Sequence, residues 1–156
     1  MGFRTGHVGI NVTNLARSQA FYESVFGLTE LGGSQEDGKK FALLGNPDVD
    51  SDEFLERLAI TLWEQSDGRR SHSTLGLHHL AFHVPSLEDV EQVRGQLSEM
   101  GVDLLGDDEV GPHNENSPSC GIFFQDPDGT RLEVCAPAGV TSSNAVCAAV
   151  VACVCY

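Results

Sequence analysis

The stretch His7-Val8-Gly9-Ile10-Asn11-Val12-Thr13-Asn14-Leu15 recurs in altered form as His79-Leu80-Ala81-Phe82-His83-Val84-Pro85-Ser86-Leu87. The offset between the two stretches is 79 − 7 = 72 residues. The same offset of 72 residues aligns Ile60-Thr61-Leu62-Trp63 with Leu132-Glu133-Val134-Cys135, more than 40 residues further along the chain. Two separate matches at one offset indicate that the chain contains two copies of one supersecondary unit.

Each copy is predicted to open with a strand and to continue into a helix. In the first copy Asn14 is a suitable N-cap, apolar residues follow at helical spacing, and Gly27 stands where a C′ residue belongs. In the second copy Ser86 and Asp89 are spaced as a capping box, and Gly101 ends the helix. The buried stripe of the second helix is predicted at Leu87, Val90, Val93, Leu97 and Met100.

Three strand candidates follow each helix. They lie at about 29–33, 40–45 and 58–64 in the first copy, and at about 103–106, 120–125 and 130–135 in the second. The tight-turn sequence Asp126-Pro127-Asp128-Gly129 joins the last two. The repeated unit is therefore predicted to be βαβββ, with a linker near 66–76 between the copies.

Composition limits the classes of partner. The chain has 156 residues, 40% hydrophobic and 21% charged, which is typical of a soluble globular protein. Its formal charge of −14 and its lack of a basic cluster argue against nucleic-acid binding. No run reaches the roughly 20 apolar residues that cross a bilayer. The N-terminal residues lack the apolar core of a secretory signal and the five cysteines form no Cys-x-x-Cys motif, so we expect a cytoplasmic protein.

Several motifs together resemble the vicinal oxygen chelate superfamily. They are the two His-led strands, the helix ending Val25-Phe26-Gly27-Leu28, and Phe124-Gln125-Asp126-Pro127-Asp128-Gly129-Thr130-Arg131-Leu132-Glu133. The superfamily includes glyoxalase I, fosfomycin- and bleomycin-resistance proteins, methylmalonyl-CoA epimerase and extradiol ring-cleaving dioxygenases. The resemblance implies an α+β fold in which two βαβββ modules form an incomplete barrel around a metal site. It implies one domain over 1–137, with modules at about 5–66 and 77–137, followed by an apolar, Cys-rich tail at 138–156 whose role is open.

The resemblance also implies the metal ligands His7, His79 and Glu133, with Thr61 at the fourth repeat-related position. Two imidazoles and one carboxylate form a set that leaves open coordination positions, and a carboxylate in a Leu-Glu-Val run is expensive to bury alone. Strand alternation puts His79 on one face with Ala81 and His83, and Glu133 on one face with Arg131 and Cys135.

The alternatives are ordinary ones. Either histidine could be a partly buried residue without a ligand, Glu133 could pair with Arg131 at the rim, and His78 is a rival to His79. Glu64 is predicted to be solvated rather than to replace the fourth ligand.

Other residues are candidates for binding or acid–base roles. His113, in a Gly- and Pro-containing loop, is either a proton shuttle or merely exposed. Arg131 could hold an anionic substrate group or form a salt bridge with one of the many acidic residues. Residues expected to line the cavity, or to be plain core, are Phe41, Leu43, Ile122 and Phe124.

The function implied is that of a metal-dependent enzyme acting on a small molecule. A ring-cleaving or related dioxygenase that chelates vicinal substrate oxygens is favoured, with Fe(II) as the cofactor and Mn(II), Zn(II) or Ni(II) as other possibilities. A glyoxalase-like lyase or isomerase, a resistance-type transferase, and a non-catalytic binder of cationic molecules are the alternatives. Thr61 argues against glyoxalase chemistry, because a carboxylate or equivalent is usual there. We expect a homodimer, and neither a nucleic-acid nor a membrane partner.

Overall fold

The computed structural model describes residues 6–36, 38, 40–47, 59–71, 73, 75–106, 110–112 and 119–137. The chain divides into two compact units, Met1–Ser71 and His72–Tyr156, and each is described by itself. The assignment of one domain to 1–137 stays a prediction, and the 138–156 tail lies outside the described residues.

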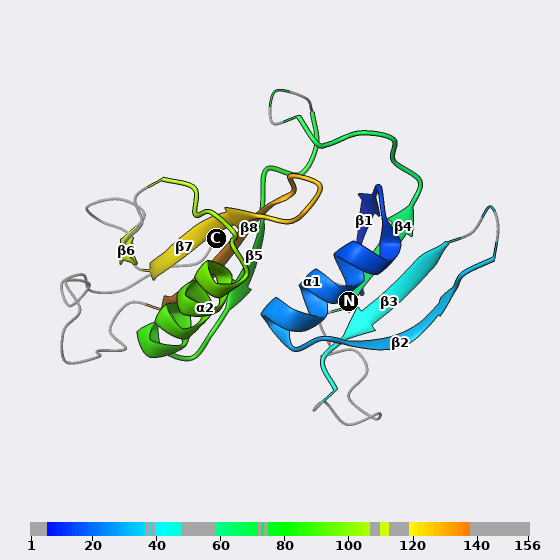
Figure 1. The fold of residues 1–156 in the computed structure, drawn as a ribbon. Coiled ribbons are helices and arrows are strands. Elements are labelled where there is room, and N and C mark those ends of the chain that lie inside the picture. Colours follow the sequence, from blue (N-terminus) through cyan, green and yellow to red (C-terminus); the bar gives the residue numbers. More distant parts are fainter. Residues whose placement is uncertain are drawn as a thin grey trace, which may run out of the picture. The chain divides into compact units, whose positions relative to one another are not determined.

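Unit one contains β1 (Val8–Val12), α1 (Leu15–Phe26), β2 (Thr29–Ser34), β3 (Phe41–Gly45) and β4 (Ala59–Glu64). The strand order is β1-β4-β3-β2, in which β1 is parallel to β4 and the other pairs are antiparallel. Helix α1 packs on β3 and β4 (Figure 1). Unit one is thus an open sheet with its helix on one face.

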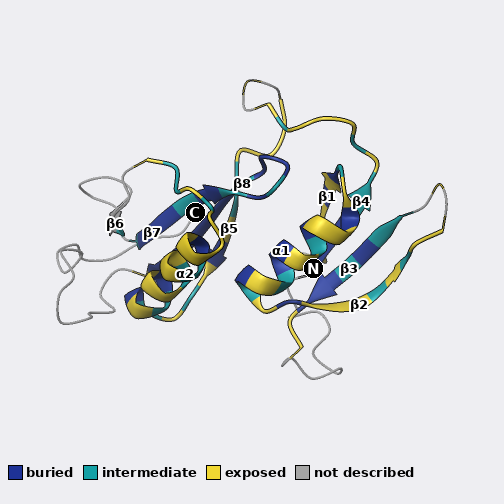
Figure 2. Ribbon diagram, in the orientation of Figure 1, coloured by how far each residue is buried: buried dark blue, intermediate teal, exposed yellow. Residues whose placement is uncertain are grey.

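The ends of α1 follow the predicted capping. The side chain of Asn14 accepts a hydrogen bond from the Arg17 N–H at 2.9 Å, and Gly27 adopts φ 63° at the C-terminal end. The buried face of α1 comprises Leu15, Ser18, Phe21, Tyr22 and Val25. The sheet of this unit contributes equally buried residues, namely Ile10, Val12, Ala42, Leu44, Ile60 and Leu62. Figure 2 shows buried segments in dark blue on both α1 and β3.

Unit two repeats this architecture. It contains β5 (Leu80–His83), α2 (Leu87–Glu99), β6 (Gly111–Pro112), β7 (Ser119–Gln125) and β8 (Arg131–Pro137), in the order β5-β8-β7-β6. The capping box is present: the Ser86 side chain accepts from the Asp89 N–H, and the Asp89 carboxylate accepts from the Ser86 N–H. The predicted α+β fold of two βαβββ modules is confirmed.

The sheet registers preserve the repeat residue by residue. Gly9 pairs with Thr61 between β1 and β4, and Ala81 pairs with Glu133 between β5 and β8. Each residue of the second pair thus lies 72 positions after its counterpart in the first pair. Leu43 opposite Thr61 corresponds to Phe123 opposite Glu133, however, an offset of 123 − 43 = 80. Eight residues added before β7 are therefore compensated by a connection to β8 that is eight residues shorter than its counterpart.

That shorter connection is built around Asp126. Its carboxylate oxygen Oδ1 accepts from the N–H groups of Asp128 at 2.9 Å and Thr130 at 2.7 Å. Gly129 adopts φ 87°, a conformation that favours glycine. Asp126 is only 2% exposed, so its carboxylate is the local partner for backbone donors that water does not reach. The turn holds β7 against β8.

Some expectations about unit two were wrong. The segment 103–106 is not a strand: Leu104 forms an isolated bridge to Phe124, and the first strand after α2 lies at Gly111–Pro112. Met100 does not extend the buried stripe of α2, since it lies at the helix end and is exposed. Val93 is only partly buried.

Neither helix in the described segments has the length and apolar character that a bilayer crossing requires. The cytoplasmic location stays a prediction.

Candidate functional site

Each face of the β5-β8-β7 sheet has a different character. Leu132, Val134, Ile122 and Phe124 lie on the side of α2 and are at most 3% exposed. Because side chains alternate along a strand, Glu133 lies on the other face, and its cross-strand partners are Ala81 and Phe123. Glu133 is nevertheless only 7% exposed, so a carboxylate is buried on the face that has no helix in its own unit.

Glu133 has an imidazole as its partner. Oε2 of Glu133 lies 3.0 Å from Nε2 of His79, the residue immediately before β5. Two ligand atoms that each lie about 2.1 Å from one ion at a right angle are about 3.0 Å apart, so these two atoms are placed as adjacent ligands of a single octahedral ion would be. The donor set of His79 and Glu133 therefore fits a divalent metal.

Phe123 organises the surroundings of this pair. Its ring meets the His79 ring edge to face, with centroids 5.7 Å apart. The guanidinium carbon of Arg131 lies 4.3 Å from the Phe123 centroid. One aromatic ring thus contacts both the imidazole and the cation of the same sheet face.

His78 and Cys135 lie at the margin of the pair. His78 is exposed, and its Nδ1 lies 2.8 Å from Nδ1 of His79, so His79 rather than His78 is the neighbour of Glu133. Cys135 is a free, buried thiol two residues after Glu133. Burial, followed by the negative charge of Glu133, raises the pKa of Cys135 to about 12.

The equivalent face of unit one lacks a carboxylate. Thr61, 6% exposed, occupies the position of Glu133, with Gly9 and Leu43 as its cross-strand partners. The rings of Phe41 and Trp63 stack on this face, with their centroids 4.7 Å apart. His7 is exposed and directly precedes β1, as His79 precedes β5.

The described residues do not bring three potential ligands together. Among them, no group of three His, Cys, Asp or Glu side chains is placed to hold an ion. His79 and Glu133 belong to unit two and His7 belongs to unit one, so the three-ligand set stays a prediction. His113 lies outside the described residues.

Comparison with known proteins gives the family. The family model of the glyoxalase/bleomycin resistance protein/dioxygenase superfamily matches residues 4–134. The chain belongs to this superfamily. The match spans both units, so the repeat and the residues on its sheets are those of a superfamily domain.

The chain is similar to several proteins of known activity or structure. A trivalent organoarsenical cleaving enzyme of Bacillus sp. (strain MD1) is 30% identical over 132 residues, which cover 81% of this chain and 69% of the relative. A glyoxylase/bleomycin resistance protein/dioxygenase domain from Frankia sp. EAN1pec has a TM-score of 0.70 at 23% identity, covering 88% of this chain and 99% of that one. The fosfomycin resistance protein FosX from Listeria monocytogenes, complexed with Mn(II) and sulfate, has a TM-score of 0.62 at 20% identity, covering 87% and 93%.

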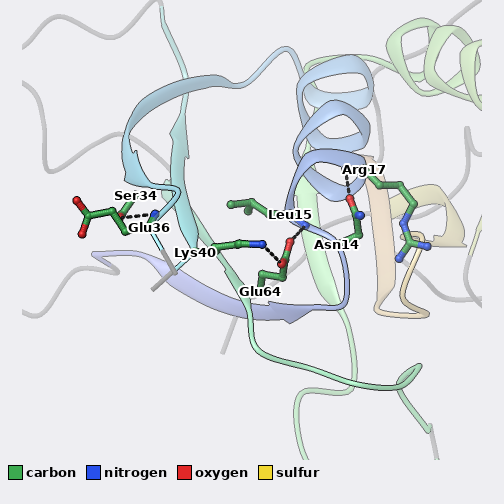
Figure 3. A network of polar contacts seen from close by, with 7 residues as sticks. All are labelled: Asn14, Leu15, Arg17, Ser34, Glu36, Lys40 and Glu64. Carbon is green, nitrogen blue, oxygen red and sulfur yellow. Dashed lines mark hydrogen bonds and ion pairs between the residues drawn. The ribbon is translucent and has the colours of Figure 1, made fainter. Parts of the chain in front are cut away.

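Glu64 of this superfamily chain is partly exposed, as the sequence-based expectation of a solvated residue implies, but it also has two structural partners. Its Oε2 accepts a hydrogen bond from the Leu15 N–H at 2.8 Å, and its Oε1 pairs with Nζ of Lys40 at 3.0 Å (Figure 3). The backbone donor first, and Lys40 second, hold the pKa of the Glu64 carboxyl below its ordinary value. Glu64 therefore caps the N-terminus of α1 from a distant strand and is occupied structurally.

For Ile122 and Phe124, expected either to line the cavity or to be plain core, the structure supports plain core. Ile122 and Phe124 lie in the core beneath α2, whereas Phe123 shares the face of Glu133. Sequence reasoning overlooked Phe123, because Ile122-Phe123-Phe124 shows no alternation of apolar and polar residues. Counting outward from the turn would have found it, since Gln125 opposite Arg131 requires Phe123 opposite Glu133.

Proposed function

We propose that this chain is a metal-dependent enzyme in which His7, His79 and Glu133 hold one divalent ion and a small molecule binds through two neighbouring oxygens. The 3.0 Å separation of His79 Nε2 and Glu133 Oε2 is the observation that carries the proposal. The repeat supports His7 as the third ligand, because it stands one residue before β1 as His79 stands one residue before β5.

The chain's own residues would perform defined tasks. The carboxylate of Glu133 would be held facing the ion, because its strand is paired on both sides. The edge contact with Phe123 would keep the His79 ring in its orientation. A bound divalent ion supplies chelation and polarisation of vicinal oxygens and, when it is iron, redox chemistry with dioxygen. Thr61 brings no carboxylate, so open positions remain for substrate.

Within the superfamily we favour a ring-cleaving or related dioxygenase with Fe(II). The three-ligand set supports this choice, because a 2-His-1-carboxylate site with open positions is typical of non-haem Fe(II) oxygenases. A trivalent organoarsenical is a second candidate substrate, supported by the 30% identical relative that cleaves such compounds. Glyoxalase-like reactions have weaker support, since Thr61 stands at the fourth position.

Metal analysis of anaerobically purified protein tests the proposal. We expect one divalent ion per chain, with loss of retention in His7→Ala, His79→Ala and Glu133→Ala and full retention in His78→Ala. Oxygen consumption with catechols, measured beside cleavage of a trivalent organoarsenical, then separates the two substrate classes. Full metal retention in folded His79→Ala would contradict the proposed site.

We also propose that the chain forms a homodimer. In its own sheet each of β1 and β5 is an edge strand, and uncovered edges favour pairing with a second chain. Light scattering over a range of concentrations tests this, and a monomer at every concentration would contradict it.

A further inference from the structure

Arg131 has a buried donor without a partner. Its Nε is inaccessible to solvent, and in the described part of the chain it is the one such side-chain nitrogen or oxygen that makes no hydrogen bond. The alternatives considered from the sequence, a rim pair with Glu133 or a salt bridge to another acid, are not observed among the described residues. Glu133 instead pairs with His79.

The guanidinium is also held in a definite position. Its carbon lies 4.3 Å from the centroid of the Phe123 ring, a cation–π contact that supports one flat side of the group. Phe123 is the cross-strand partner of Glu133 and contacts the ring of His79. Arg131 itself lies two residues before Glu133, on the same face of β8. The cation is therefore fixed next to the two candidate ligands.

A buried N–H that makes no hydrogen bond is destabilising relative to a satisfied one. Because Nε itself is inaccessible to solvent, a ligand would accept from the outer N–H groups of the guanidinium. A guanidinium offers parallel N–H donors in one plane, which match the two oxygens of a carboxylate.

We propose that Arg131 binds a carboxylate group of the substrate, so that the substrate is a small organic anion carrying a carboxylate near its two chelating oxygens. This inference rests on the proposed function, because it takes the face of Glu133 as the substrate site. It narrows the substrate class to anionic molecules.

The net charge of −14 does not oppose this assignment. At physiological ionic strength the Debye length is about 8 Å, so exposed acidic groups farther away are largely screened. A carboxylate in contact with Arg131 interacts with a partly buried cation that is screened much less. The acidic surface disfavours the binding of anions in general, whereas the site beside Arg131 favours the binding of a carboxylate.

Matched probes test the proposal on the full chain. They are 3,4-dihydroxybenzoate and 3,4-dihydroxybenzamide, together with the 2,3-isomers, which share vicinal oxygens and size and differ in charge. Calorimetry gives the dissociation constants for metal-free and Mn(II)-loaded protein. We expect wild-type protein to prefer at least one benzoate over its amide by about tenfold or more, as a charge-assisted hydrogen bond predicts.

The variants then identify the responsible group. Arg131→Met should abolish the preference by weakening benzoate binding much more than amide binding, and Arg131→Lys should retain only part of the preference, because an ammonium lacks the planar fork. Arg94→Met, on the exposed surface of α2, is the matched control and should keep the full preference. Circular dichroism checks folding, and Arg131→Lys keeps the test decisive if Arg131→Met does not fold.

Opposite results would overturn the inference. They are a wild-type protein that prefers neither benzoate, or folded Arg131→Met or Arg131→Lys protein that keeps the full preference. Metal content is measured on every variant and reports on the proposed function separately. A wild-type chain that retains no divalent ion would refute the metal site, while the preference of the metal-free protein would still decide the role of Arg131.

Discussion

Replacement of Asp126 by alanine should destabilise unit two strongly. The carboxylate Oδ1 accepts two backbone hydrogen bonds, at 2.9 and 2.7 Å, from residues 128 and 130, both of which are only 3% exposed. Hydrogen bonds to charged groups contribute about 1.5–3 kcal/mol each, and alanine leaves both donors buried and unpaired. We expect Asp126→Ala to lower the free energy of unfolding by about 3 kcal/mol or more. Asp126→Asn keeps an oxygen acceptor and should lose about half as much.

Urea unfolding followed by circular dichroism gives the free energies, and native-state hydrogen exchange of the β7 and β8 amides assigns the loss to this hairpin. Asp103→Ala, which removes an exposed carboxylate of the same unit, is the control and should stay within about 0.5 kcal/mol of wild type. A folded Asp126→Ala protein that loses less than about 1 kcal/mol would show that the two bonds do not hold β7 against β8.

Three further predictions concern other positions. Gly121→Ala should cost about 2 kcal/mol or more in urea unfolding, because its Cβ would overlap the Val134 carbonyl oxygen and Cys135 Cβ, whereas Gly32→Ala, with open space around it, serves as the control. Glu64→Gln should lower the free energy of unfolding at neutral pH. A carboxyl whose pKa is lowered on folding stabilises the folded state at pH values above its unfolded pKa of 4.5. The difference in stability from wild type should therefore shrink as the pH falls through the folded pKa. Unfolding curves between pH 3 and 7 measure it, and a pH-independent difference would contradict the capping role. Thr61→Glu should raise the affinity for Mn(II) and Mg(II) by placing a second carboxylate at the repeat-related position; metal titration of the apo proteins checks this, and unchanged affinity in a folded variant would show that residue 61 does not face the ion.

The helices and most strands could be predicted from the sequence because their signals are local. Asn14, Ser86 and Asp89 act within three residues of their partners, and Gly27 needs only its own conformation. The repeat supplied the rest, since the offset of 72 holds between the parallel strand pairs. The prediction of a strand at 103–106 was wrong because it relied on the same offset, which the eight added residues before β7 break.

The candidate site was only partly accessible to sequence reasoning. Proximity of His79 to Glu133 follows from the register of β5 and β8, whereas strand alternation predicts only the face that each side chain takes. The structural partners of Glu64 could not be predicted, because Leu15 is 49 residues away and no local pattern reports that contact. Phe123 was missed within an uninterrupted apolar run, where the two faces of a strand look alike.

The two halves of the candidate metal pair differ in mechanical freedom. Glu133 is on β8, an inner strand held by ladders to β5 and β7, whereas His79 precedes β5, the edge strand of the sheet. Strands bonded on both sides open last, and chain segments beside an edge strand open at lower free energy. The carboxylate is thus the positionally restricted ligand and the imidazole the mobile one. Exchange of an ion, or adjustment to ions of different radius, would proceed by movement of His79 while Glu133 stays in place.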